Sequence, residues 1–188
     1  EIMPSLVGSE MCIRDRSYAR KKAVVVVTQF NHPRELTAEA KRAIDSLLTR
    51  GIQLRNQTVL LRGVNDKSEV LGELLRGLTA MNVAPYYIFQ CRPVTGVKGR
   101  FQVPIAEGIG IVDGAKAMQS GLGKAVRYAM SHPRGKIEMI GRLPDTDETI
   151  FKFHQNKYPE DNARIFTRKL SELSLIHISE PTRLGMIS

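Results

Sequence analysis

The feature that most constrains this chain is a pattern that occurs three times, a short apolar run followed by a stretch with helical spacing. The apolar runs cover residues 23–30, 56–61 and 84–91, and the helical stretches lie at about 38–50, 70–81 and 105–118. Thr37 is placed to cap the first helix and Gly51 to end it. Strand-then-helix units in succession imply parallel strands joined by right-handed crossovers. We therefore predict an α/β fold, with the first strand covered on both faces.

Three such units are too few to close a barrel, which normally needs about eight. Residues 17–125 are therefore predicted to form the C-terminal half of a partial (β/α) barrel of the TIM type. The pattern changes after Gly121, where the runs "KAVRYAM", "KIEMIG", "TIFKFHQ" and "ARIFTR" alternate in hydrophobicity and are separated by turn residues. Alternation of this kind is typical of strands. Residues 126–172 are therefore predicted to add a strand and a small β-rich C-terminal appendage.

The two ends of the chain do not share these patterns. The strings "LVGSEMCIRDR" at residues 6–16 and "LSLIHISEPTR" at residues 173–183 show neither a helical nor a strand period. Both resemble translations of an adapter used in sequencing libraries, because one DNA strand encodes the second string and its complement encodes the first. Residues 1–16 and 173–188 are therefore expected to be non-native tails and are set aside from the fold prediction.

The composition is that of a soluble domain, with 42% hydrophobic and 25% charged residues. The longest apolar run is too short to span a bilayer, so we expect a cytoplasmic protein without a membrane partner. Cys12 and Cys91 cannot by themselves form a disulfide framework or a metal site. The net charge of +9 is compatible with an anionic partner, but aromatic residues make up only 6% and show no stacking pattern. No nucleic-acid partner is expected.

Polar side chains gather where each of the three predicted parallel strands ends. In parallel α/β folds the loops that leave the C-terminal ends of the strands build the functional site. The candidates from these loops are Gln29, Asn31, His32, Arg62, Asn65, Asp66, Gln90 and Arg92. No glycine-rich phosphate loop, zinc spacing or nucleophile elbow accompanies them. From the residues alone, the prediction ends at a polar strand-end face.

Several of these residues also have a purely structural interpretation. Asp66 and Glu69 have the spacing of a capping box at a helix start. His32 precedes Pro33 and could be an ordinary loop residue. Cys91 fits a small buried side chain, and Lys136 follows a turn signal at the start of a strand, where a lysine is usually solvated. Both interpretations stay open for each residue.

Three strings resemble one known family in their order and spacing. "TQFNHPRELT", "NQTVLLRGVND" and "APYYIFQCRPVTG" are similar to segments of the lysine 2,3-aminomutase family of radical S-adenosylmethionine enzymes. The resemblance is strong over residues 23–112. It implies an incomplete α/β barrel, pyridoxal phosphate, S-adenosylmethionine and a 4Fe-4S iron–sulfur cluster held by a CxxxCxxC loop. That loop is absent here and is expected upstream of residue 17.

The resemblance also assigns roles to individual residues. Lys136 matches the lysine that forms a Schiff base with pyridoxal phosphate, and Asp66 matches the aspartate that binds the side-chain amine of lysine. A second substrate-binding aspartate of the family aligns with Ser131, which puts lysine as the substrate in doubt. Gln29, Asn31 and His32 fall where the barrel mouth would face S-adenosylmethionine. Ile44 occupies the position of a zinc-binding cysteine, so that zinc is not expected.

The sequence thus predicts part of a radical aminomutase that acts on a small amino-acid substrate by 1,2-amino migration. The parent enzyme is an isomerase in this interpretation and could form a homo-oligomer, whereas this chain alone is expected to be inactive without the cluster-binding part. The alternative is a non-catalytic basic α/β module that binds nucleic acid or another polyanion. Salt dependence of nucleic-acid binding separates the two.

Overall fold

The computed structural model describes residues 22–92 and 100–169, so the two predicted adapter-derived tails lie outside the described residues. Within these ranges the chain is α/β, with one mixed sheet of seven strands in the order β1-β2-β3-β4-β5-β6-β7. The strands are β1 Val25–Thr28, β2 Gln53–Leu60, β3 Val83–Gln90, β4 Arg127–His132, β5 Gly135–Arg142, β6 Glu148–Asn156 and β7 Ile165–Lys169. The helices are α2 Ala38–Leu48, α3 Ser68–Ala80 and α4 Ile105–Ala117, with single 3-10 turns at η1 Pro33–Glu35, η2 Gly121–Ala125 and η3 Pro159–Asp161.

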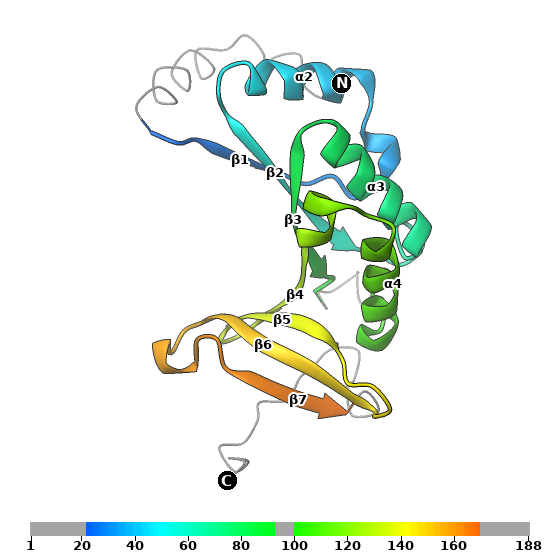
Figure 1. Cartoon of the computed structure of the whole chain (residues 1–188), viewed down its shortest axis with the longest axis vertical. Coiled ribbons are helices and arrows are strands. Elements are labelled where there is room, and N and C mark those ends of the chain that lie inside the picture. The colour runs from blue at the N-terminus through cyan, green and yellow to red at the C-terminus, as the bar shows by residue number, and fades with distance from the viewer. Residues whose placement is uncertain (1–21, 93–99, 170–188) are drawn as a thin grey trace.

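The first four strands pair in parallel, as the three strand-then-helix units predict. The three α-helices lie on one side of these strands (Figure 1). They bury a continuous apolar core with the strand residues that point toward them, for example Leu54, Leu60 and Ile88. The opposite face of the parallel strands has no helix over it in the described part of the chain. Residues from this uncovered face line the cavity described below.

The four runs after Gly121 are all strands, as predicted. β4 pairs with β5, β5 with β6 and β6 with β7 in antiparallel fashion, so these strands extend the same sheet. In Figure 1 the strands β5–β7 lie at the foot of the view, beneath α4. Phe151 and Phe153 are buried; the Phe151 ring stacks with Phe166, and the Phe153 ring is tilted against it. The antiparallel strands therefore belong to the same core as the helices.

The first strand differs from its prediction in length and burial. It covers four residues, Val25–Thr28, and only one of its faces meets the core, through Val26. Val25 and Val27 point the other way and are 40% and 49% exposed. The prediction that both faces are covered was wrong, because the helices of the described residues cover only one side of the sheet.

The predicted ends of the first helix are confirmed. The Thr37 hydroxyl accepts a hydrogen bond from the Ala40 amide at 3.2 Å, which satisfies an otherwise unpaired donor of the first turn. Gly51 has φ +77°, the left-handed conformation that ends many helices. Ile44 is 3% exposed and packs in the core. No helix in residues 22–92 and 100–169 has the length and apolar character that crossing a membrane requires.

Candidate functional site

A cavity of about 710 Å³ opens on the face of the sheet that the helices leave uncovered. Its position follows from the alternation of side chains along β2. Leu60 packs toward Gly108 of α4, so its neighbours Val59 and Leu61 face away from the helices and toward the cavity. The lining residues are Gln29, Gln57, Val59, Leu61, Phe89, Gln90, Cys91, Arg92, Phe101, Ser131 and Lys136. We call this space the lysine cavity, after Lys136.

Lys136 enters the lysine cavity from the start of β5. It lies opposite Ser131 of β4 and Gln155 of β6 in the sheet register. Its ammonium nitrogen lies 4.2 Å from the centre of the Tyr87 ring and 5.0 Å from that of Phe89. Such contacts favour a cation through the negative ring faces. The lysine is therefore held against aromatic side chains of β3 and is not a freely solvated surface residue.

Tyr87 is itself fixed by the antiparallel strands. Its hydroxyl lies 2.6 Å from Nε2 of His154, and Arg127 lies 3.3 Å from the same imidazole. The Glu138 carboxylate is 3.7 Å from Arg127 and 3.9 Å from His154. Burial, with a smaller contribution from Tyr86, raises the pKa of Tyr87 to about 12. Burial and the nearby Arg127 lower the pKa of His154 from its ordinary 6.5.

The cluster of Tyr87, Arg127, Glu138 and His154 has no counterpart in the sequence predictions. Its members come from β3, β4, β5 and β6, and they meet only through the register of those strands. Alternation in the runs 127–132 and 135–142 indicates which residues share a face. It does not indicate which strands are neighbours.

Of the three residues predicted to face S-adenosylmethionine, only Gln29 lines the lysine cavity, where it is exposed. The Asn31 side chain accepts a hydrogen bond from the Val59 amide at 2.8 Å, which holds the loop after β1 against β2. Nδ1 of His32 accepts from the Arg34 amide at 3.1 Å, so His32 caps the 3-10 turn η1. The structure brings Gln29 and Lys136 to one cavity and places Asn31 and His32 outside its described lining.

Asp66 does not cap α3. The helix begins at Ser68 with Lys67 in the capping position and no side-chain cap, so the capping-box interpretation of Asp66 is wrong. The Asp66 carboxylate instead accepts a hydrogen bond from the Gly63 amide at 2.9 Å. Gly63 has φ +72°, which turns the backbone so that its amide meets that carboxylate. Asp66 closes this turn and lies outside the described lining of the lysine cavity.

Two buried amides lie behind the site: Asn65, a strand-end candidate from the sequence, and Asn56, which the sequence prediction did not single out. Asn56 is 1% exposed, accepts from the Phe30 amide at 2.7 Å, and donates to the Phe30 carbonyl at 3.0 Å. Asn65 is fully buried and donates to the Asn31 and Val59 carbonyls while accepting from the Leu61 amide. These bonds fasten the loops after β1 and β2 to each other. A signal existed, because Asn56 occupies an inward position between apolar residues of β2.

The far side of the lysine cavity is held by the segment before α4. The Arg62 amide donates to the Phe101 carbonyl at 2.8 Å, and the Gln90 side chain donates to the Val103 carbonyl at 2.6 Å. Arg92 donates to the Ser131 hydroxyl at 2.8 Å, which links the ends of β3 and β4. Cys91 is 6% exposed, and burial raises the pKa of its thiol. Its thiol therefore stays protonated and contributes to the lining of the cavity.

The described residues do not contain a ligand set for a metal ion. No group of three or more His, Cys, Asp or Glu side chains in residues 22–92 and 100–169 is arranged to hold one. The site as described thus consists of one amine, two aromatic rings, one guanidinium and several neutral hydrogen-bonding groups. That combination suits a small organic ligand with anionic groups.

Comparison with known proteins gives one consistent set of relatives, although no family profile matches the chain. A Clostridium subterminale protein named L-lysine 2,3-aminomutase is 46% identical over 120 residues, which are 64% of this chain and 28% of that protein. Glutamate 2,3-aminomutase of Clostridioides difficile is 35% identical over 133 residues, 71% of this chain and 30% of that protein. An Aquifex aeolicus protein named as an inferred L-lysine 2,3-aminomutase is 44% identical over 149 residues, 79% of this chain and 39% of that protein. The chain thus spans about two fifths or less of these relatives' length.

Proposed function

Because this chain belongs to the lysine 2,3-aminomutase family, we propose that it is part of an enzyme that moves an amino group between neighbouring carbons of a small amino acid. Relatives named for lysine and for glutamate both match, so lysine or a related amino acid is the proposed substrate. The parallel strands are proposed to be part of a (β/α) barrel of the TIM type. Alone, the chain is proposed to be inactive, because it spans two fifths or less of its relatives' length.

The observation that carries this proposal is the position of Lys136. Its amine projects into a cavity of about 710 Å³ between aromatic walls, at the edge where the parallel strands end. Ligands of parallel α/β sheets bind at that edge. A lysine amine in a partly apolar pocket is the group that binds an aldehyde cofactor covalently.

The residues around Lys136 fit pyridoxal phosphate. Phe89 and Phe101 offer flat apolar surface for its ring. When bound, the cofactor would stabilise charge or unpaired electron density on the migrating amino group. Tyr87 and Phe89 keep the lysine nitrogen on the cavity side of β5. The bond from Tyr87 to His154 keeps that tyrosine ring in place.

S-adenosylmethionine and a 4Fe-4S cluster are proposed for the parent enzyme on the family resemblance. The described residues provide no ligand set for such a cluster. Gln29 is the candidate for contact with S-adenosylmethionine that lines the lysine cavity; Asn31 and His32 would act by holding the loop that carries it. Asp66 would reach a substrate amine only if its bond to the Gly63 amide were given up or shared.

The test of this proposal does not need catalysis. The 188-residue chain is incubated with pyridoxal phosphate, reduced with borohydride and mapped by mass spectrometry. We expect a stable adduct on Lys136 and a visible absorbance that is lost in Lys136→Ala. Lys124→Ala is the matched control, since Lys124 is exposed on η2 and lies outside the described lining of the cavity.

Equal labelling of Lys124 and Lys136 would contradict the assignment. Steep, salt-sensitive binding of nucleic acid without any specific adduct would favour the alternative of a basic, non-catalytic module.

A further inference from the structure

A second cavity, of about 380 Å³, adjoins the lysine cavity at the turn between β4 and β5. The two share Arg92, Ser131 and Lys136 in their linings. The second cavity also takes in Lys157, which follows β6, and Asn156, the last residue of that strand. We call it the basic pocket. It lies at the same edge of the sheet as the lysine cavity, so one small ligand could occupy both.

The basic pocket concentrates positive charge without a carboxylate in its described lining. Arg92, Lys136 and Lys157 all border it. None of these three is ion-paired within the described part of the chain: Arg92 donates to the Ser131 hydroxyl, Lys136 lies over Tyr87 and Lys157 lies 5.9 Å from the centre of the Tyr158 ring. Cations placed around a concave surface attract an oxyanion.

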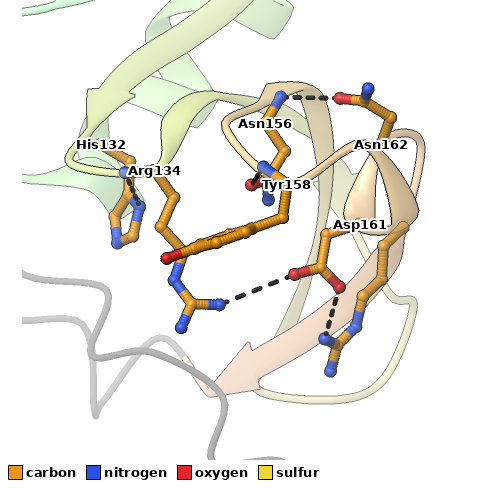
Figure 2. A network of polar contacts seen from close by, with 7 residues as sticks. His132, Arg134, Asn156, Tyr158, Asp161 and Asn162 are labelled. Atoms are coloured by element: carbon orange, nitrogen blue, oxygen red, sulfur yellow. Dashed lines mark hydrogen bonds and ion pairs between the residues drawn. The ribbon is translucent and has the colours of Figure 1, made fainter.

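Arg134 also borders the pocket, but its charge is already engaged. Figure 2 shows its guanidinium directed toward Asp161, at 3.6 Å, and beside the Tyr158 ring. Asp161 also pairs with Arg164 at 3.2 Å. The charge available to a ligand therefore comes from Arg92 and Lys157, and from Lys136 while no cofactor is bound to its amine.

A second, independent observation concerns Asn156. The residue is 8% exposed, and its Nδ2 atom has no hydrogen-bond partner among the described residues. Its Oδ1 atom accepts from the Tyr158 amide at 3.0 Å, which fixes the orientation of the side chain (Figure 2). A buried amide donor normally has an acceptor. The unpaired Nδ2 donor thus belongs to a residue that borders the basic pocket.

From these observations we infer that the basic pocket is an oxyanion subsite for the substrate, so that the amino acid handled here carries an acidic side chain. The reaction type in this inference rests on the proposed function. The substrate class rests only on the residues of the basic pocket. The side-chain ammonium of lysine would face Arg92 and Lys157 in the basic pocket, and the described linings of both cavities contain no carboxylate to receive it. Asp66 is bonded to the Gly63 amide and borders neither.

The experiment is calorimetric titration of the full chain with L-glutamate, L-lysine and inorganic phosphate, first without pyridoxal phosphate and then with it bound. We expect L-glutamate to bind in both states and L-lysine to bind at least about tenfold more weakly. Arg92→Gln and Lys157→Gln should each weaken L-glutamate binding about tenfold, the usual loss for one charge-assisted hydrogen bond. Lys124→Gln removes the same charge from an exposed site outside both described linings and should leave the affinity unchanged.

Three results would overturn the inference: preference for L-lysine, equal weakening in Lys124→Gln, or loss of L-glutamate binding once pyridoxal phosphate is bound. The last result would assign the pocket to the cofactor phosphate. If Arg92→Gln unfolds the chain, judged by circular dichroism, Arg92→Lys keeps the charge and must retain more binding than the Lys157→Gln variant. A missing adduct on Lys136 together with intact L-glutamate binding would refute the proposed function and leave the subsite standing.

Discussion

The parallel strands β1–β4 and the antiparallel strands β5–β7 share one sheet but use their polar side chains in different ways. In the parallel part, Asn31, Asn56 and Asn65 are committed to backbone groups and fasten the loops that follow β1 and β2. In the antiparallel part, Lys136 of β5 lines the lysine cavity, where a ligand can reach it, and His154 of β6 contacts the Tyr87 hydroxyl. The parallel part is thus a frame of bonded loops, whereas the antiparallel part places an amine in a cavity.

Hydrogen-bond satisfaction shows the same difference. The buried side-chain atoms without a partner in the described residues, Thr149 Oγ1 and Asn156 Nδ2, both belong to β6. The buried amides of the parallel part have partners on each side-chain oxygen and nitrogen. Unsatisfied buried groups are tolerated where they serve a ligand, and they reduce stability elsewhere. Stability is therefore expected to depend most on the parallel part.

The largest expected effect is that of Asn65→Ala. The Asn65 side chain accepts one hydrogen bond, from the Leu61 amide, and donates two, to the Asn31 and Val59 carbonyls. Because Asn65 is fully buried, its removal leaves these three backbone groups without that partner. We expect a loss of about 3–5 kcal/mol in the free energy of unfolding, measured by urea denaturation.

The matched control is Asn162→Ala in the antiparallel part. Asn162 is exposed and accepts one bond, from the Asn156 amide at 2.7 Å. Its removal should cost about 1 kcal/mol or less. Equal costs for the two variants would refute the view that the parallel part is the frame.

The next effect concerns the turn that forms the basic pocket. Gly135 has φ +146°, and a Cβ placed there would lie 2.0 Å from the Gln155 carbonyl oxygen. Because the obstacle is backbone of the neighbouring strand, Gly135→Ala must push β5 from β6 at Lys136. We expect about 2–3 kcal/mol of destabilisation and loss of the pyridoxal phosphate adduct. A stable variant with an intact adduct would show that the turn does not position the lysine.

Sequence patterns predicted local features well and long-range ones poorly. The Thr37 cap and the Gly51 end follow from residue chemistry within a few positions, and the four alternating runs after Gly121 follow from strand periodicity. The capping box at Asp66 failed although it is also local, because Gly63 adopts a left-handed conformation and offers its amide first. Spacing alone does not reveal which of two nearby donors a carboxylate will meet.

The site could be predicted only in part for a related reason. Strand-end residues can be listed from the sequence, but Lys136 meets Tyr87, and Tyr87 meets His154, only through the order and register of four strands. Likewise, the position of the helices determines that only one face of β1 is covered. Both features depend on tertiary packing, which an alternating sequence pattern does not specify.

A smaller effect, of opposite sign, is expected on α4. Gly110 is exposed within this helix, and a Cβ there would meet nothing within 4 Å. Gly110→Ala should therefore stabilise the chain by about 0.5–1 kcal/mol, through lower backbone entropy of the unfolded state. Urea denaturation measures the gain. The adduct on Lys136 should be unchanged, and a change in it would mean that the helix layer and the reactive face are coupled.

The smallest expected effect is a pH dependence that originates in the antiparallel part. Burial and Arg127 lower the pKa of His154 below 6.5, so the unfolded chain binds a proton more readily than the folded one. The stability contribution of His154 is therefore complete above pH 6.5 and falls as the pH decreases below that value toward the folded pKa. His154→Gln should flatten this part of the curve in denaturation series between neutral and mildly acidic pH, whereas His32→Gln, a change in the parallel part, should preserve it. If the slope persists in His154→Gln, the proton is taken up elsewhere and the link from His154 through Tyr87 to Lys136 is not pH-sensitive in this range.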